Sequence, residues 1–239
     1  PLPPLRVQAR IVEILDKFTQ LETELETELE ARNKQYDFYR NRLLDFVHRD
    51  DFDGKVEWKT LGEICKNLDS QRRPITSSKR KKGIYPYYGA SGIVDFVESY
   101  IYEGDYLLVS EDGANLLARN TPIAFSISGK NWVNNHAHVL KFDTYEGRKF
   151  VEYYLNQIDL KPYISGAAQP KLNQNNLNSI PIPLPPLSEQ RRIVEILDRF
   201  DTLTNSISEG LPREISLRRK QYEYYRDALL RFPPPAPTA

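Results

Sequence analysis

The 239-residue chain lacks methionine and has a single cysteine, Cys65. One thiol cannot form an internal disulfide or a cysteine-rich zinc site, which excludes a scaffold stabilised by its own disulfides. No apolar run approaches the ~18 residues of a membrane-spanning helix, and no apolar signal segment opens the chain. Because methionine is missing even at position 1, we expect a processed, engineered or excised piece.

The chain also has no net charge, because 33 acidic residues balance 33 basic ones. The two signs are unevenly distributed. Residues 1–53 contain 8 basic and 12 acidic residues, residues 54–183 contain 16 and 13, and residues 184–239 contain 9 and 8. Zero total charge argues against a nucleic-acid-binding protein, whereas the excess of positive charge in the central segment favours one.

Two segments near the start of the chain are repeated near its end. Residues 2–18 recur as residues 184–200 with 13 of 17 positions identical, and residues 34–46 recur as residues 220–232 with 8 of 13 identical. The offset grows from 182 to 186, so the second copy holds four extra residues, which we place at 210–213. A repeat of this size indicates two related elements flanking a central domain.

Both copies have the apolar spacing of long helices, with steps of three and four residues that mark one narrow stripe. Helices of about 40 residues are about 60 Å long, so we expect the two to pair antiparallel as a coiled-coil stalk. The alternative is that each stripe packs on the central domain. Gly210 and Pro212 are expected to kink or interrupt the second helix. The predicted coiled-coil interface comprises Ile14, Phe18, Leu21, Leu25, Leu29, Ile196, Phe200, Leu203 and Ile207.

The central segment alternates apolar residues with turns rich in glycine and asparagine, which predicts a domain with a mostly antiparallel or mixed sheet. The fold class is therefore α+β. We place the first long helix at 1–48, the central domain at 49–183, the second helix at 184–232 and a proline-rich tail at 233–239. Strands are expected over residues 56–58, 84–88, 93–97, 106–110, 122–127 and 138–142, and helices over 61–66 and 148–158.

The stretch from residue 71 to residue 92, here called the basic segment, contains six cations and no acid. Each cation could neutralise one DNA phosphate, and arginine and lysine can also bond to guanine in the major groove. A solvated basic loop is the alternative. The candidate DNA contacts here are Arg72, Arg73, Ser78, Lys79, Arg80, Lys81, Lys82, Tyr87 and Ser91.

Residues 165–176, here called the amide loop, are rich in small residues and side-chain amides. Small residues allow a ligand to approach the backbone, and asparagine and glutamine can pair bidentately with adenine. The alternative is a polar loop that merely leads to the second helix. We select Gln169, Lys171 and Asn173 as further candidate DNA contacts.

The sequence contains little that indicates catalysis. His136 and His138 lie one residue apart, but no further ligand marks a metal site, so we predict no metal and interpret both as structural or exposed histidines. Asp51, Asp53, Glu57 and Lys59 faintly resemble a nuclease cluster, yet their close spacing favours a solvated linker. Neither a nucleophile elbow nor a methyltransferase-like Asn/Asp-Pro-Pro-Tyr segment is present.

With these features combined, the sequence resembles the specificity subunits of Type I restriction–modification systems. The resemblance rests on the proline-rich helix entry at 183–194, on residues 220–226, on their counterparts in the first copy, and on residues 84–92. In that family, a subunit contains two target recognition domains joined by two antiparallel helices. This chain has both helices but one recognition domain, so it resembles a half-subunit.

The resemblance implies a non-catalytic subunit that reads one half of a bipartite site in double-stranded DNA. Its helices would set the spacing and dock methyltransferase and restriction subunits. Those partners would use S-adenosylmethionine, ATP and Mg, whereas this chain would bind no cofactor. A homodimer or a second half-subunit would supply the missing domain, and the location implied is the cytoplasm of a bacterium or archaeon, away from membranes.

Two other function classes remain open from the residues alone. The chain could be a structural coiled-coil protein that dimerises without DNA specificity. It could also be a nuclease or methyltransferase itself. Salt-sensitive, sequence-selective duplex binding distinguishes the first reading from the structural one, and metal- or methyl-donor-dependent turnover would indicate an enzyme.

Overall fold

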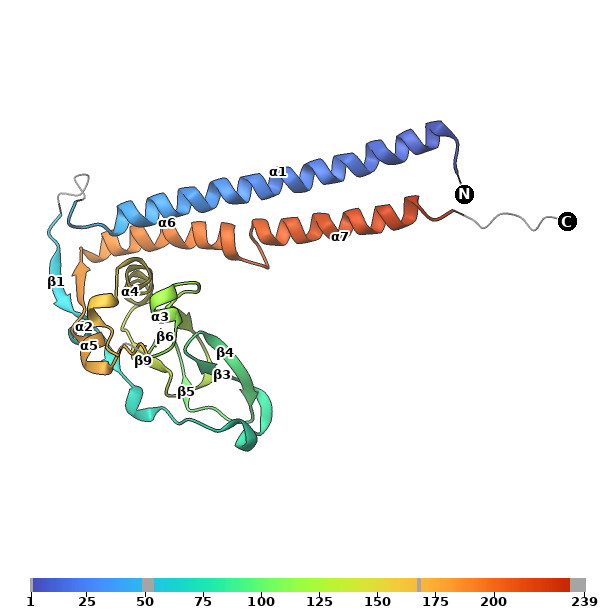
Figure 1. Cartoon of the computed structure of the whole chain (residues 1–239). Helices are drawn as coiled ribbons and strands as arrows, with labels where there is room; N and C mark the ends of the chain where they lie inside the picture. The colour runs from blue at the N-terminus through green and yellow to red at the C-terminus, as the bar shows by residue number, and fades with distance from the viewer. Residues whose placement is uncertain (1, 49–53, 167–168, 233–239) are drawn as a thin grey trace. The chain divides into compact units, whose positions relative to one another are not determined.

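The computed structural model describes residues 2–48, 54–166 and 169–232 and divides into two compact units. A helical unit comprises residues 1–39 and 196–239, and a sheet unit comprises residues 40–195. Both boundaries lie inside helices (Figure 1). The proline-rich tail and two acids of the supposed nuclease cluster, Asp51 and Asp53, lie outside the described residues. None of the described helices is long and apolar enough to cross a membrane.

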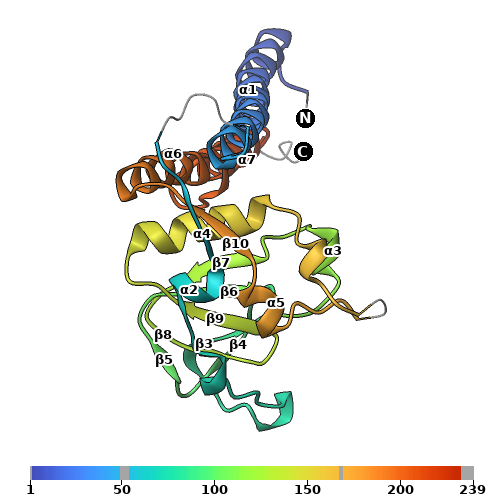
Figure 2. The ribbon, with the colours of Figure 1, turned by 90° about the vertical axis from the view of Figure 1, so that its left-hand side faces the viewer.

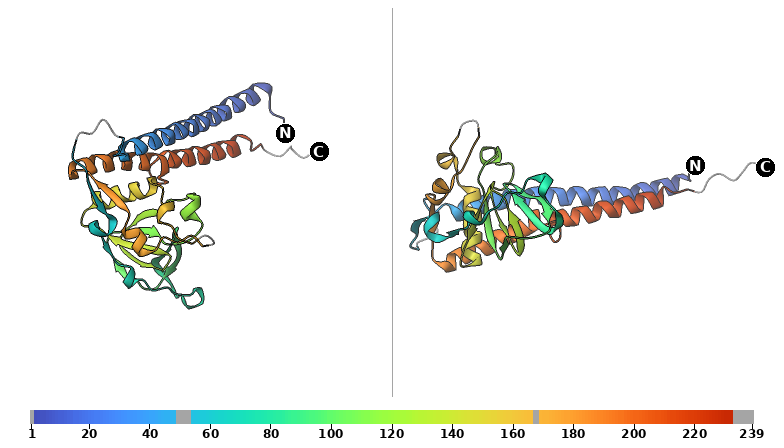
Figure 3. Two further views of the ribbon diagram at one scale, coloured as in Figure 1. Left: turned by 60° about the vertical axis from the view of Figure 1, so that its left-hand side comes forward. Right: turned by 90° about the horizontal axis from the view of Figure 1, so that it is seen from below.

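The helical unit pairs α1 (Leu5–Leu44) with α6 (Leu187–Asn205) and α7 (Leu211–Leu229) in antiparallel fashion (Figures 1 and 3). The rings of Phe18 and Tyr225 stack with centroids 5.3 Å apart near one end. Toward the other end, Phe200 stacks on Tyr36 at 6.0 Å and on Tyr39 at 5.5 Å. Contacts that run in opposite sequence directions confirm the predicted antiparallel coiled coil.

The repeat is visible as a shared way of entering a helix. The Gln8 side chain donates to the Pro3 carbonyl at 2.7 Å, and its counterpart Gln190 donates to the Pro185 carbonyl at 2.9 Å. Proline can precede a helix in this way because the first turn needs no backbone donor there. The same sequence therefore folds into the same local structure in both copies.

The second helix is interrupted between α6 and α7, as the residues at 210–213 predicted. The predicted interface is wrong at Ile207, which lies in this break and is 83% exposed. Leu21 and Leu203 are also more exposed than a seam position, at 42% and 36%. The helix has to turn at Gly210, so the apolar spacing there does not follow one continuous helical face. The other predicted seam residues are partly buried: Ile14, Phe18, Leu25, Leu29, Ile196 and Phe200.

Gly210 fills a position without room for a side chain. A Cβ there would overlap the Thr202 carbonyl oxygen and lie 2.7 Å from the Leu203 carbonyl oxygen. We expect Gly210→Ala to lower the free energy of unfolding by about 1–3 kcal/mol, the usual cost of forced overpacking. Urea denaturation followed by circular dichroism measures this loss. A variant as stable as the wild type would show that the corner adapts without strain.

The sheet unit contains two four-stranded sheets and one two-stranded sheet (Figure 2). The first is antiparallel, in the order β2 (Lys66–Asn67), β9 (Ala137–Lys141), β6 (Tyr106–Ser110) and β7 (Ala124–Ile127). The second has the order β4 (Gly92–Val97), β3 (Lys82–Gly89), β8 (Lys130–Val133) and β5 (Tyr102–Glu103), with β3 and β8 parallel. In the third, β1 (Glu57–Thr60) pairs with β10 (Pro181–Leu184). The predicted α+β class with a mixed sheet is confirmed.

The core of this unit lies between the sheets, and α4 (Tyr145–Gln157) packs against the first of them. All five residues of β6 are buried, and the first four of them form a continuous apolar run. Asn156 on α4 accepts from the Ile123 and Ala124 backbone amides and donates to the Ala124 carbonyl, which satisfies the backbone at β7. The remaining short helices are α2 (Leu61–Ile64), α3 (Asn115–Ala118), α5 (Gln174–Asn178), η1 (Asp69–Gln71), η2 (Ser77–Lys79) and η3 (Lys161–Tyr163).

Candidate nucleic-acid interface

The basic segment leads through η2 into β3, and aromatic side chains hold its backbone by hydrogen bonds. The Tyr87 hydroxyl accepts from the Ile75 backbone amide at 2.9 Å, and the Trp132 indole donates to the Arg73 carbonyl at 2.6 Å. Tyr87 is 1% exposed, so it anchors the segment and does not face a ligand. This corrects its prediction as a DNA contact. β-Strand alternation turned its ring inward, toward the core.

Two of the six cations in the basic segment are used to hold its conformation. Arg80 donates to the Ile75 carbonyl, pairs with Asp95 at 3.3 Å and lies 4.5 Å from the centre of the Tyr87 ring. A backbone amide at Phe96 and the Arg80 guanidinium lower the pKa of Asp95. Arg72 is drawn further inward, with 14% of its side chain exposed. Neither guanidinium is displayed as the sequence suggested.

The remaining candidates in the basic segment are exposed. Lys81 lies 3.0 Å from Glu98, in a pair whose side chains are largely in solvent, so this contact holds the ammonium only weakly. The other exposed candidates are Arg73, Ser78, Lys79, Lys82 and Ser91. The structure thus brings a set of accessible cations together on a segment with fixed anchors.

The amide loop closes through a short β-bridge. Ser165 and Lys171 exchange backbone hydrogen bonds of 2.8 Å in both directions. Gly166 has a φ of +84°, and a Cβ there would overlap the Gln169 carbonyl oxygen, so glycine suits this turn. The loop ends where Asn173 accepts from the Asn176 amide at 2.9 Å and caps α5. Asn173 is therefore used for capping, whereas Gln169 and Lys171 are exposed.

Gln169 lies at an open pocket that the sequence did not reveal. Its neighbours there include Asp112, His136 and the apolar side chains of Leu117 and Pro170. The His136 Nδ1 atom lies 2.8 Å from Asp112, and half of the histidine side chain is exposed. This places polar side chains from two other loops, Asp112 and His136, beside one of the candidate DNA contacts.

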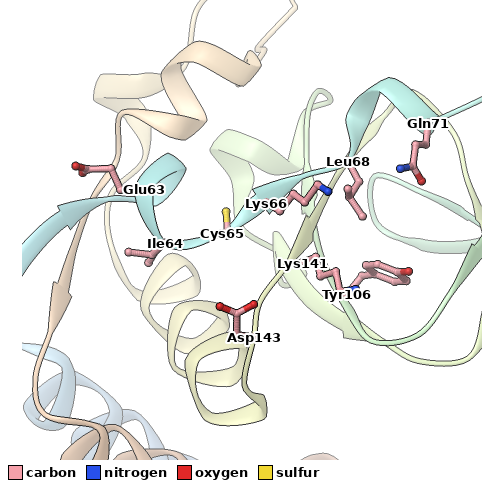
Figure 4. A pocket seen from close by; sticks show the side chains of 9 residues that line it. All are labelled: Glu63, Ile64, Cys65, Lys66, Leu68, Gln71, Tyr106, Lys141 and Asp143. Atoms are coloured by element: carbon pink, nitrogen blue, oxygen red, sulfur yellow. The ribbon is translucent and has the colours of Figure 1, made fainter.

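A second pocket, shown in Figure 4, offers no comparable chemistry. Lys66 and Lys141 line it together with Glu63 and Asp143, so its charges balance. Burial raises the pKa of Cys65 to about 12, and its thiol donates to the Leu61 carbonyl. A protonated, hydrogen-bonded thiol is a poor nucleophile.

Between the basic segment and the amide loop lies a cluster of five ionisable side chains, of which four are mostly buried and one, Lys171, is half-exposed. Glu111 accepts from Arg72 at 2.5 Å and lies 3.0 Å from Lys171. His138 is fully buried, with Nδ1 2.5 Å from Asp69 and Nε2 2.7 Å from the Leu172 carbonyl. We call Asp69, Arg72, Glu111, His138 and Lys171 the ionic cluster. The sequence missed it because its members are brought together from four separate segments, with only Asp69 and Arg72 close in sequence.

The two carboxylates of the ionic cluster are held in the ionised form. Burial would raise the pKa of Asp69, but hydrogen bonds from His138 and Val139 outweigh burial and lower it. Burial would likewise raise the pKa of Glu111, but the contacts with Arg72 and Lys171 outweigh burial and lower it. Burial raises the pKa values of Cys65 and Tyr102 beside them, so both stay neutral.

Asp69, Glu111 and His138 are also the one group in the described residues with metal-like spacing, their ligand atoms lying within 4.8 Å of one another. The protein's own cations already neutralise this group. Arg72 and Lys171 bind the Glu111 carboxylate, and His138 uses its second nitrogen on a backbone carbonyl. The residues do not fit a metal ion, because a divalent cation would face the positive charges of Arg72 and Lys171.

The sequence matches the family described as "Type I restriction modification DNA specificity domain" over residues 54–217. It is 38% identical to the EcoR124I/EcoR124II specificity subunit of Escherichia coli, covering 98% of this chain and 62% of that one. It is also 38% identical to the EcoprrI specificity subunit of Escherichia coli, covering 87% and 52%. The chain thus spans roughly half to two-thirds of the length of these two relatives.

Solved structures share the fold at low sequence identity. An S subunit of a Type I restriction–modification system from M. genitalium superposes with a TM-score of 0.68 and 18% identity, over 96% of this chain and 62% of that one. An HsdS subunit from Thermoanaerobacter tengcongensis gives a TM-score of 0.61 and 19% identity, over 97% and 60%. On the family match and these identities, the chain belongs to the Type I restriction–modification DNA specificity family.

Proposed function

We propose that the sheet unit recognises one half of a bipartite site in double-stranded DNA and that the chain itself catalyses no reaction. The observation that carries this proposal is that Lys79, Lys81 and Lys82 are exposed on the basic segment, while other residues of that segment make internal contacts that fix its conformation. A fixed cationic surface binds phosphates without first losing its own conformational freedom.

The helical unit supports a role in spacing and assembly. Its 40-residue helix α1 is about 60 Å long at ~1.5 Å per residue, more than one turn of duplex DNA. A paired helix of that length fixes distances that a flexible linker would not. We propose that it sets the separation between two DNA-reading domains and docks methyltransferase and restriction subunits. The cofactors of the complete assembly, S-adenosylmethionine, ATP and Mg, would belong to those subunits.

The repeat supports the presence of a second reading domain in the working assembly. Val194 in the second copy is 2% exposed, whereas its counterpart Val12 in the first copy is 55% exposed. Leu187 and its counterpart Leu5 differ in the same direction, at 49% and 81%. The first copy is thus more exposed at both positions, and only the second copy has one of them, Val194, fully buried. We propose that a second domain of the same kind covers these positions of the first copy, supplied by another copy of the chain or by a complementary chain.

Salt dependence tests the DNA-binding proposal. Each neutralised phosphate contributes about 0.9 to the slope of log affinity against log salt, so Lys79→Gln, Lys81→Gln and Lys82→Gln together should reduce the slope by about 2.7. Fluorescence anisotropy with a random-sequence duplex measures it. The matched control replaces Lys59, Lys66 and Lys161, exposed lysines elsewhere in the sheet unit. Equal slopes in both triple variants would show that these three lysines do not contact phosphates, and a wild-type chain without salt-dependent duplex binding would favour a structural coiled-coil protein.

A further inference from the structure

The basic segment and the amide loop are both attached to one buried carboxylate. Glu111, which is 8% exposed, follows β6 and contacts a cation from each loop. Its Oε2 accepts from Arg72 Nη1 at 2.5 Å, and its Oε1 lies 3.0 Å from Lys171 Nζ. The Glu111 carbonyl also accepts from the Leu172 backbone amide at 2.8 Å. A displacement of either loop would leave one Glu111 oxygen without its partner.

Behind Glu111, Asp69 and His138 fasten the same two loops to strand β9. Leu172 presents a carbonyl and ionised Asp69 presents a carboxylate, and both groups can only accept hydrogen bonds. Each His138 ring nitrogen therefore lies against an oxygen atom, one from Asp69, just before the basic segment, and one from the amide loop. The second Asp69 oxygen accepts from the Val139 backbone amide at 2.9 Å. Arg72 adds a bond to the Ala137 carbonyl at 2.9 Å.

We propose that the ionic cluster holds the basic segment and the amide loop in a fixed relative position, with Glu111 as the positioning residue for DNA recognition. The inference rests on the proposed function and deepens it. Recognition of base edges depends on side-chain positions, whereas attraction to phosphates depends mainly on total charge. Loosening the cluster should therefore affect sequence preference more than overall binding.

The choice of ionic groups supports positioning over simple stabilisation. A buried ion cluster contributes little net stability compared with apolar side chains of similar volume, because desolvation offsets most of the attraction. Its hydrogen bonds, however, have fixed directions and allow few alternative arrangements. Here those bonds end on Arg72, at the start of the basic segment, and on Leu172, in the second half of the amide loop.

Glu111→Gln tests the proposal, because glutamine keeps the size of the side chain and removes its charge. The matched control is Glu98→Gln, which removes an exposed carboxylate beside Lys81 and leaves the ionic cluster intact. The full chain is first used to select duplexes from a randomised library. The preference of each variant for the selected duplex over random duplex is then measured across a salt titration, below the melting temperature of every variant.

We expect Glu111→Gln to lose about tenfold of the preference, the order of one base-pair contact, while its salt slope stays near that of the wild type. Glu98→Gln should keep the preference. If Glu111→Gln does not fold, Glu111→Asp decides, since it keeps the charge but reaches only one cation and should lose part of the preference. A wild-type preference in the folded Glu111 variant would overturn the positioning role alone. A wild-type chain that selects no sequence would overturn the proposed function itself.

Discussion

Phe200→Asp is expected to separate the paired helices of the helical unit. Phe200 stacks on both Tyr36 and Tyr39, so its replacement removes two ring contacts at once and leaves a carboxylate between aromatic side chains. Truncation of a core phenylalanine typically costs about 3–5 kcal/mol, and burial of a charge adds to that. Because Phe200 is only partly buried, we expect about 3 kcal/mol, which is a large share of the stability of so small a unit.

The matched control for this change is Ile207→Asp. Ile207 has the apolar spacing of the seam in the sequence, but it is exposed in the break between α6 and α7. Ile207→Asp should unfold at the same urea concentration as the wild type, whereas Phe200→Asp should lose its helical circular dichroism at a lower urea concentration. Equal effects of the two variants would mean that the second helix is continuous and that the break between α6 and α7 is not present in solution.

The contrast between Phe200 and Ile207 shows what periodicity can and cannot predict. Steps of three and four residues depend on side-chain direction along one unbroken helix, so they identified α1 and most of its interface. They could not place residues beyond a change in helix direction, although Gly210 and Pro212 did mark where that change occurs. The domain boundaries drawn from the sequence, at 48/49 and 183/184, stay a prediction.

Strands were predictable where apolar residues alternate or run together. The segments over β3, β4, β6, β7 and β9 agree with expectation to within a few residues, whereas the two-residue strands β2 and β5 have no pattern of their own. Strand β8 pairs in parallel with β3 because of long-range packing, which no local spacing encodes.

The candidate site was predictable as composition but not as geometry. Six cations without an acid identified the basic segment, yet only the structure shows that Arg72 and Arg80 point inward. Their partners Glu111 and Asp95 lie 39 and 15 residues away in the sequence. His138 is a structural histidine, as one of the two expected interpretations had it. Its acidic partner Asp69 lies just after β2, 69 residues earlier in the sequence. Which of the exposed residues contact DNA stays a prediction.

Asp69→Ala should be the most destabilising single change in the sheet unit. The Asp69 carboxylate accepts from His138 at 2.5 Å and from the Val139 amide at 2.9 Å, and Arg72 lies 3.4 Å away. Alanine would leave a ring nitrogen of His138 and the Val139 backbone amide buried without their shared partner. Removal of one partner from a buried charge pair costs about 3–5 kcal/mol, so we expect a loss of that size at neutral pH.

The pH dependence of this loss separates the charge of Asp69 from its packing. Burial alone would raise the pKa of Asp69, but donors from His138, Val139 and Arg72 lower it below the ordinary value of 3.8. The folded state therefore favours the ionised form. The resulting stability is fully present above that ordinary value and is lost as the pH falls through the lower, folded value. The gap between wild type and Asp69→Ala should accordingly narrow in acid.

Asp112→Ala is the matched control, because Asp112 also pairs with a histidine, at 2.8 Å, in the same unit. That pair is partly in solvent, where such contacts contribute less than about 1 kcal/mol. Urea denaturation of the three proteins at neutral and acid pH gives the comparison. Similar losses for Asp69→Ala and Asp112→Ala at neutral pH would show that burial does not strengthen the Asp69–His138 pair. If the stability difference between wild type and Asp69→Ala stays constant as the pH falls, the Asp69 carboxylate acts through its volume and not through its charge. That result would argue against a charge on Asp69 as part of what holds the amide loop.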